Sequence, residues 1–129
     1  MKRTGILNAD LSGAIGRLGH TDLVVVGDCG LPRPHGVPVI DLAVTFGVPS
    51  FEAVVRALAG EIVVEKAWVA TETADANPAA QELLESLFGE PETLSHEELK
   101  KKSGDAVLLV RTGEATPFAN VILRCGVPF

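Results

Sequence analysis

One histidine and one aspartate flank a short apolar segment, and their side chains are the best candidates for chemistry. His20 follows an amphipathic stretch at 7–18, and Asp28 follows Leu23–Val26, which is predicted as a buried strand. Ligands of α/β sheets usually bind at the carboxyl ends of strands. We therefore expect the imidazole of His20 and the carboxylate of Asp28 to converge on one cleft, where they would bind a small polar ligand and perform acid–base chemistry.

Other chemistries could use the same residues. Cys29 follows Asp28 and could act as a nucleophile with His20 as its base, although a buried structural thiol is the commoner outcome. A metal site could combine His20, Asp28 and His96, but their spacing matches no strong metal motif. Asp28 could also simply accept hydrogen bonds from the turn that follows it. The residues alone therefore predict a polar ligand site without fixing its reaction.

The composition restricts the class of protein. The net charge of -6 and the pI of about 5.0 argue against a nucleic-acid partner, because no basic stripe is present to replace counterions. No segment approaches transmembrane length, and two cysteines suit a reducing compartment, so we expect a cytoplasmic protein without membrane insertion. The hydrophobic content of 47% is high for a lone domain of 129 residues, and it predicts apolar surface buried between subunits.

Helix and strand patterns alternate along the chain. Gly19 has the position of a glycine that ends the first helix, and Ser95 with Glu98 forms a capping box that starts a helix at His96. We expect further helices at 51–62 and 78–88, and further strands at 39–44, 63–73, 106–111 and 120–125. This alternation predicts an α/β sheet with helices packed on it, formed by a single domain over residues 1–129.

Several short motifs occur together and in order along this sequence. They are Gly5–Asn8, Leu18–Asp22, Asp28–Pro32, Leu94–Glu98, Arg111–Asn120 and Gly126–Phe129. With them the chain resembles the RbsD/FucU family, and in particular its D-ribose pyranase branch, over essentially its whole length. The resemblance implies a three-layer sandwich with a central, mostly parallel or mixed sheet flanked by helices. It also implies an isomerase of free D-ribose that needs no cofactor or metal and works as a cytoplasmic homo-oligomer, often a homodecamer.

The resemblance also implies roles for individual side chains. Proton transfer falls to His20, and sugar binding falls to Asp28, His96, Phe118, Ala119, Asn120 and, as a further polar contact, Lys102. Typical ribose members carry a tyrosine where this chain has Phe118, and the chain contains no tyrosine that could replace the lost hydroxyl. Ala119 resembles the ribose branch more than the fucose branch. The family's C-terminal segment makes contacts between subunits, so we expect Phe118–Asn120 to face His20 of another chain.

The implied reaction is intelligible from elementary chemistry. Opening a cyclic sugar requires a proton delivered to the ring oxygen and another removed from the anomeric hydroxyl, and a histidine that titrates near neutrality can do both. Three other functions remain open. They are an L-fucose-type mutarotase, a non-catalytic sugar-binding accessory protein and a cysteine-dependent hydrolase. A rate that depends on His20 would separate the enzyme from the accessory protein, and inactivation by thiol alkylation would indicate the hydrolase.

Overall fold

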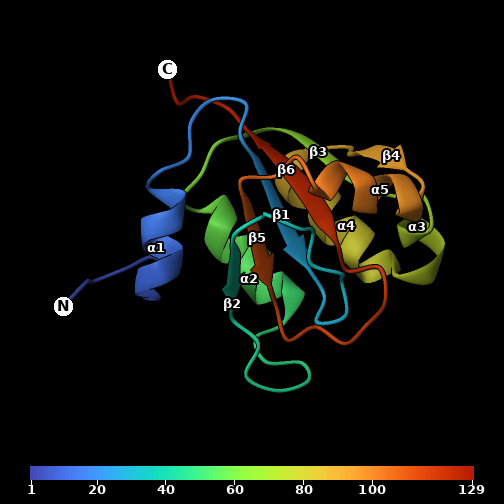
Figure 1. Cartoon of the computed structure of the whole chain (residues 1–129), viewed down its shortest axis with the longest axis horizontal. Coiled ribbons are helices and arrows are strands. Elements are labelled where there is room, and N and C mark those ends of the chain that lie inside the picture. The colour runs from blue at the N-terminus through green and yellow to red at the C-terminus, as the bar shows by residue number, and fades with distance from the viewer.

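The computed structural model of residues 1–129 is organised around a six-stranded mixed sheet with the order β2-β5-β1-β6-β3-β4 (Figure 1). The strands are β1 (Leu23–Gly27), β2 (Val39–Asp41), β3 (Val64–Ala70), β4 (Glu92–Leu94), β5 (Leu108–Arg111) and β6 (Val121–Cys125). Strand β5 is parallel to β1 and β2, and β3 is parallel to β4, whereas β6 is antiparallel to β1 and β3. All strands except β6 therefore end at the same edge of the sheet.

Helices cover the sheet and make the fold a three-layer sandwich, as the resemblance implied. They are α1 (Ala9–Ile15), α2 (Phe51–Ala59), α3 (Thr73–Ala76), α4 (Pro78–Phe88) and α5 (His96–Ser103). In Figure 1, α2 and α4 lie behind the strands. Their apolar faces join α1 and one face of the sheet in the larger core, while α5 packs on the other face through Leu99. Successive residues of β1 alternate between these two cores, because side chains alternate across a strand.

Capping residues fix where the helices begin. Ser50 accepts a hydrogen bond from the Ala53 amide at 3.1 Å, and Asn77 accepts one from the Ala80 amide at 3.1 Å. The predicted capping box is confirmed, because Ser95 and Glu98 satisfy each other's amides. The helix expected at 7–18 is shorter and runs from Ala9 to Ile15, between the caps Asn8 and Gly16. Gly19 therefore does not end it, and residues 17–22 form a turn that leads into β1.

The other differences from the expected elements concern short segments. The strand expected at 39–44 ends at Asp41, because the carboxylate of Asp41 accepts a hydrogen bond from the Ala43 amide and turns the chain. The segments of α3 and β4 were not predicted. Strand β4 is three residues long and largely polar, and it owes its place to pairing with β3 at the edge of the sheet. No helix is long and apolar enough to cross a bilayer.

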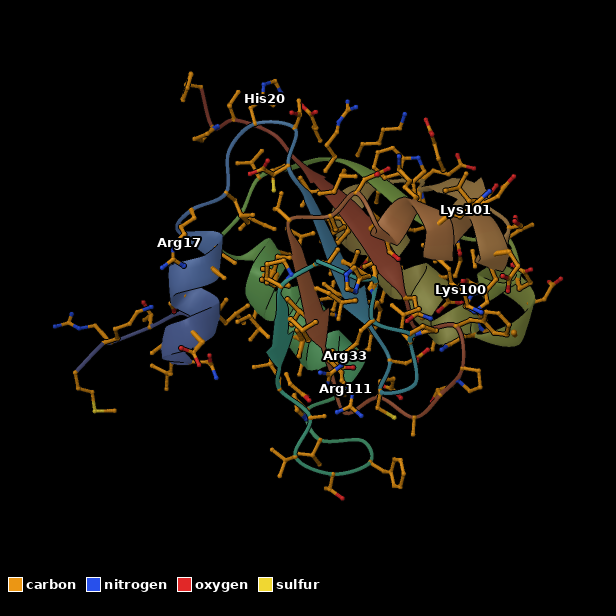
Figure 2. All side chains as sticks on the ribbon, in the orientation of Figure 1. Arg17, His20, Arg33, Lys100, Lys101 and Arg111 are labelled. Carbon is orange, nitrogen blue, oxygen red and sulfur yellow. The ribbon has the colours of Figure 1, made fainter.

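The candidate residues lie at two opposite ends of the sheet. His20 lies beyond the amino end of β1, next to the carboxyl end of β6, whose Cys125 carbonyl accepts a hydrogen bond from the Thr21 amide at 2.9 Å. Arg111 lies at the opposite end, where it pairs with Gly27 of β1 (Figure 2). Five strand residues separate these ends, which corresponds to about 16 Å at the usual rise of a strand. His20, before β1, and Asp28, after it, therefore lie at opposite ends of the sheet.

Candidate active site

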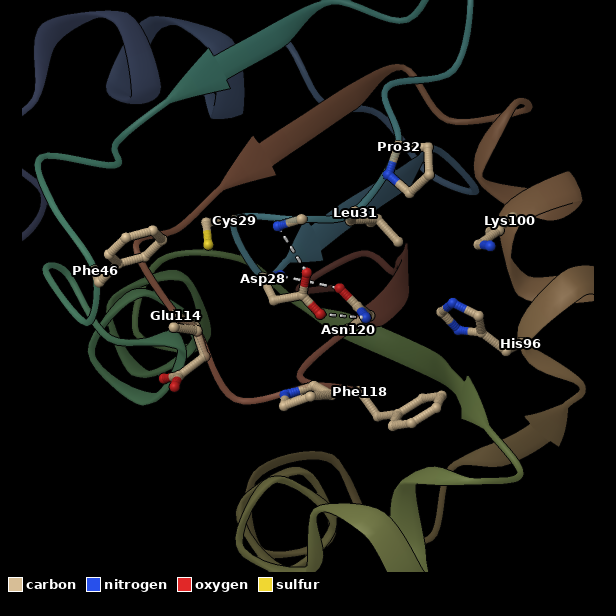
Figure 3. Close-up of a pocket in the computed structure, with 13 residues that line it drawn as sticks. Asp28, Cys29, Leu31, Pro32, Phe46, His96, Lys100, Glu114, Phe118 and Asn120 are labelled. Atoms are coloured by element: carbon tan, nitrogen blue, oxygen red, sulfur yellow. Dashed lines mark hydrogen bonds between the residues drawn. The ribbon is translucent and has the colours of Figure 1, made fainter.

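A pocket of about 400 Å³ opens at the end of the sheet where β1 stops and β6 begins (Figure 3). Its polar and aromatic lining comprises Asp28, Cys29, Phe46, His96, Lys100, Glu114, Phe118 and Asn120. These residues come from the loops after β1 and β2, from α5 and from the segment that leads into β6. The volume and the mixture of polar and apolar walls suit a small, hydroxylated ligand.

Asp28 and Asn120 are joined by a reciprocal pair of hydrogen bonds at the base of this pocket. The Asp28 amide donates to Asn120 Oδ1 at 2.9 Å, and Asn120 Nδ2 donates to Asp28 Oδ2 at 2.9 Å. Asp28 Oδ1 also accepts from the Gly30 amide at 3.0 Å. Gly27 permits this close approach, because a Cβ there would lie 3.0 Å from Asn120 Oδ1 and 2.6 Å from Leu31. The carboxylate is therefore held in one orientation, with further acceptor capacity for a ligand hydroxyl.

The side wall of the pocket is formed by α5. The capping box places His96 in the first turn, and Lys100, four residues later, lies on the same face of the helix and also lines the pocket. The Nδ1 atom of His96 is buried and has no hydrogen-bond partner within the chain. Lys102, the predicted further contact, lies elsewhere, with its Nζ 4.3 Å from the centre of the Trp68 ring. The i, i+4 spacing from His96 is the signal that would have selected Lys100.

Phe118 and Ala119 shape the segment before β6. The Phe118 ring meets the His96 ring edge-on, with 5.1 Å between centroids and an angle of 74°. Phe118 has a φ of 61°, in the left-handed region, and Asn77 Nδ2 fixes the preceding carbonyl with a hydrogen bond of 3.0 Å. Ala119 is 1% exposed, and its methyl group packs in the larger core rather than in the pocket. A ligand in this pocket therefore meets the ring of Phe118 and not the side chain of Ala119.

Glu114, which the sequence analysis did not assign to the site, and Cys29, which it considered only as a nucleophile, also line the pocket. The carboxylate of Glu114 accepts hydrogen bonds from the amides of Phe51 and Thr116 at 3.1 and 3.2 Å. Burial by itself would raise the pKa of Glu114, but these hydrogen bonds outweigh it and the pKa is lowered. The Cys29 carbonyl is fixed by Arg111 Nε at 3.1 Å. Together with a hydrogen bond of 2.8 Å from the Cys29 amide to the Glu114 carbonyl, the Arg111 contact stabilises the loop that presents Asp28.

His20 lies at the other end of the sheet, so the expectation that it converges with Asp28 within one chain is wrong. The strand between them is extended and places the two residues beyond its opposite ends. The same separation rules out, within one chain, a Cys29–His20 pair and a metal site built from His20, Asp28 and His96. No group of three or more histidine, cysteine or acidic side chains is arranged to hold a metal ion. His20 is instead on the surface, with 52% of its side chain exposed.

The surroundings of His20 are polar on one side and apolar on the other. Its Nε2 lies 3.0 Å from Glu65 Oε2, and Glu65 Oε1 lies 2.6 Å from Arg124 Nε. The hydrogen bond from His20 is the largest of the effects that lower the pKa of Glu65, and Arg124 adds to it against a smaller effect of burial. The apolar side is the C-terminal segment Gly126–Phe129, which lines a hollow of about 370 Å³ together with His20.

The backbone is strained next to both groups of candidate residues. Thr21 and Phe118 are the two residues other than glycine with a positive φ, at 73° and 61°. For a β-branched residue such as Thr21 this conformation is a genuine outlier. Such strain concentrates at functional sites, where the surrounding structure enforces it. Here Thr21 directly follows His20 at one end of the sheet, and Phe118 lies two residues before Asn120 at the other.

Comparison with known proteins relates this geometry to a family. The family model described as the RbsD / FucU transport protein family matches residues 1–128. The chain is 56% identical over 129 residues to D-ribose pyranase 1 of Rubrobacter xylanophilus, with 100% of each chain covered. It is also 56% identical over 131 residues to the D-ribose pyranase of Symbiobacterium thermophilum, again with 100% of each covered.

Solved structures show the same relationship. The structure of Bacillus subtilis RbsD complexed with D-ribose matches with a TM-score of 0.95 and 47% sequence identity, and the match covers 100% of both chains. The fucose mutarotase from Streptococcus pneumoniae, solved in complex with L-fucose, matches with a TM-score of 0.81 over 100% of both chains but is only 17% identical. The second likeness shows a shared fold alone.

Proposed function

This chain belongs to the RbsD / FucU family, and we propose on that basis that it is an isomerase which interconverts the pyranose and furanose forms of free D-ribose. The observation that carries the proposal is the pocket at the end of β1. It places a fixed carboxylate, a histidine and a lysine around a space of sugar size, in a chain whose 47% identical structural relative was solved with D-ribose. The substrate proposed is therefore a free monosaccharide.

The pocket residues would bind the sugar through complementary contacts. Asp28 accepts hydrogen bonds from ring hydroxyls. Lys100, whose Nζ donates to Glu97 at 3.1 Å and keeps further donors, and the unpartnered Nδ1 of His96 would contact other hydroxyls. Lys100 replaces Lys102 in this proposal, because only Lys100 lines the pocket. The ring of Phe118 offers an apolar surface to the C–H groups of the sugar. These contacts orient the ring without performing proton transfer themselves.

Proton transfer is assigned to His20 of a second copy of the chain. Within one chain His20 is separated from the pocket by the whole of β1, so a single chain cannot bring both to one sugar. The surface also exposes large apolar side chains that a subunit interface would cover, namely Leu7, Val44, Phe46, Val48 and Phe129. We propose a ring-shaped homo-oligomer, specifically a homodecamer, in which His20 of one copy faces the pocket of another.

Magnetisation-transfer NMR on free sugars tests the proposed activity. The protein should accelerate exchange between the pyranose and furanose signals of D-ribose, with a smaller effect on L-fucose, and EDTA should leave the rate unchanged. Unaccelerated ribose exchange, with ribose still bound, would favour the sugar-binding accessory protein. Faster exchange of L-fucose than of D-ribose would favour the mutarotase. Light scattering should give about ten times the chain mass of 13.5 kDa, and an active monomer would contradict the shared site.

A further inference from the structure

Glu65 connects His20 to the rigid part of the fold. It lies near the start of β3, where each of its carboxylate oxygens has one cationic or imidazole partner: Oε2 lies 3.0 Å from His20 Nε2, and Oε1 lies 2.6 Å from Arg124 Nε. Arg124 belongs to β6, which pairs with β3 and with β1. The imidazole is thus attached through one carboxylate to two neighbouring strands of the sheet.

The contact determines which ring nitrogen of His20 is free. An ionised carboxylate can only accept hydrogen bonds, so the nitrogen that faces Glu65, Nε2, must carry the proton. The pKa of Glu65 is lowered by its bond to His20 and by Arg124, which keeps the carboxylate ionised at neutral pH. The neutral imidazole therefore keeps its lone pair on Nδ1. That lone pair is the one available to remove a proton from a substrate.

We propose that Glu65 is a positioning residue for His20, which holds Nε2–H, directs Nδ1 toward the sugar and stabilises the imidazolium formed during the reaction. This inference rests on the proposed isomerase function. Neutral His20 takes the proton of the anomeric hydroxyl on Nδ1 while the bond from the anomeric carbon to the ring oxygen breaks and the carbonyl forms. The imidazolium then returns that proton to the former ring oxygen, which has received the electron pair of the broken bond. Ring closure on a different hydroxyl runs the same steps in reverse.

The other charged groups near His20 have different partners. Glu61 accepts a hydrogen bond from the Ile6 amide, and Asp22 accepts one from the Gly19 amide at 2.8 Å. Cys125 is buried, and burial together with Asp22 and Glu65 raises the pKa of its thiol, so it is neutral. The C-terminal carboxylate of Phe129 ends an exposed segment beside the hollow. Glu65 is the carboxylate in direct contact with the imidazole, and Arg124 is the cation that opposes its charge.

The proposal predicts effects of opposite sign for two substitutions. Histidine-selective NMR of the ligand-free oligomer can follow the titration of His20, with the signal assigned through His20→Asn. In Glu65→Gln the midpoint of this titration should move to lower pH, because a favourable charge is lost. In Arg124→Gln it should move to higher pH, because the carboxylate is no longer opposed. Neither measurement depends on enzymatic activity.

The kinetic test separates positioning from binding. Glu65→Gln should lower the maximal exchange rate about tenfold, while the ribose dissociation constant stays within about twofold of the wild type. The matched control is Glu52→Gln on α2, because Glu52 is an exposed glutamate that pairs with an arginine, as Glu65 does, but does not contact His20. It should change neither the rate nor the titration. Light scattering establishes that each variant assembles as the wild type does.

The outcomes distinguish this inference from the proposed function. If the wild type accelerates exchange but Glu65→Gln retains its rate or leaves the His20 titration unmoved, Glu65 does not position His20. Shifts of the same sign in Glu65→Gln and Arg124→Gln would also overturn the inference. If the wild type does not accelerate exchange at all, the isomerase function fails, while opposite titration shifts would still demonstrate the Glu65–His20 coupling.

Discussion

The two ends of β1 are built in different ways. At the carboxyl end, Asp28 and Asn120 are fixed by backbone amides and by each other, and Asn120 is 2% exposed. At the amino end, His20 is half exposed and its side chain contacts a single carboxylate. Most buried polar groups are paired within the chain, whereas an exposed imidazole can meet its partner from another chain. The proposed binding residues are therefore assembled within one chain, and the proposed proton-transfer group is presented outward.

The largest expected effect comes from removing the group at the amino end. His20→Asn should lower the ribose exchange rate by about 10²-fold or more, because the asparagine amide cannot transfer protons at neutral pH. The fold should persist, since the side chain lies on the surface. Magnetisation-transfer NMR measures the rate, and His35→Asn is the matched control, because His35 is an exposed histidine in a loop that lines neither hollow. Near-wild-type exchange in folded His20→Asn would exclude His20 from the mechanism.

Complementation tests whether the two ends meet between subunits. His20→Asn and Asn120→Ala should each be inactive alone. Co-expressed hetero-oligomers should regain about a quarter of the wild-type rate, because random pairing joins an intact histidine to an intact pocket in about that share of sites. The control mixes Asn120→Ala with His96→Ala, in which every pocket carries a defect and no activity should return. Mass spectrometry establishes that the hetero-oligomers form. If they form but stay inactive, the shared site is contradicted.

Local signals in the sequence predicted most of the fold. The helix caps were predictable because each cap is a hydrogen bond between a side-chain oxygen and a backbone amide three residues later in the sequence. This holds for Ser50, Asn77 and Ser95. The buried strand at the centre was predicted because its apolar run is continuous. Strand β4 was missed because a short, polar edge strand depends on its neighbour β3, which is distant in the sequence.

The candidate site was less predictable, because it depends on the direction in which the chain runs between its residues and, as proposed, on a second copy of the chain. The sequence correctly indicated that a strand lies between His20 and Asp28. The predicted common cleft was wrong because an extended strand places the residues before it and after it at opposite ends of the sheet. The contact between His20 and Glu65 joins residues 45 positions apart, and no local pattern announces it. The position of Lys100 was available from helical spacing, because it lies one turn after His96 on the same face.

A smaller effect is expected inside the prebuilt pocket. Phe118→Tyr adds one hydroxyl beside His96, and a single hydrogen bond of this kind is worth about 0.5–1.5 kcal/mol net. Ribose should therefore bind roughly two- to tenfold more tightly, while the maximal rate changes less because the proposed mechanism assigns the proton transfers to His20. Calorimetry on both forms decides the matter. Unchanged or weaker binding in the tyrosine variant would mean that the added hydroxyl does not reach the sugar.

The smallest expected effect concerns stability and compares a carboxylate at each end. The pKa of Glu114 is held below its ordinary value of 4.5 by the amides of Phe51 and Thr116, against the opposing effect of burial. A lowered folded-state pKa means that the ionised group stabilises the fold fully above about pH 4.5 and loses this contribution as the pH falls through the folded-state pKa. Glu114→Gln should therefore lower the free energy of unfolding by about 0.5 kcal/mol at pH 7, because a charge next to the first turn of α2 is lost.

The same substitution at the amino end should behave differently. Glu65 pairs with the exposed side chains of His20 and Arg124 rather than with backbone amides, and such pairs contribute little to stability. Urea unfolding of both variants at pH 7 and at a series of values below 4.5 makes the comparison. The Glu114→Gln deficit should shrink as the pH falls, while Glu65→Gln should follow the wild type closely at every pH. Equal losses of unfolding free energy in the two variants would contradict this comparison. Glu114 would then contribute no more to stability through its backbone amides than Glu65 does through its side-chain partners.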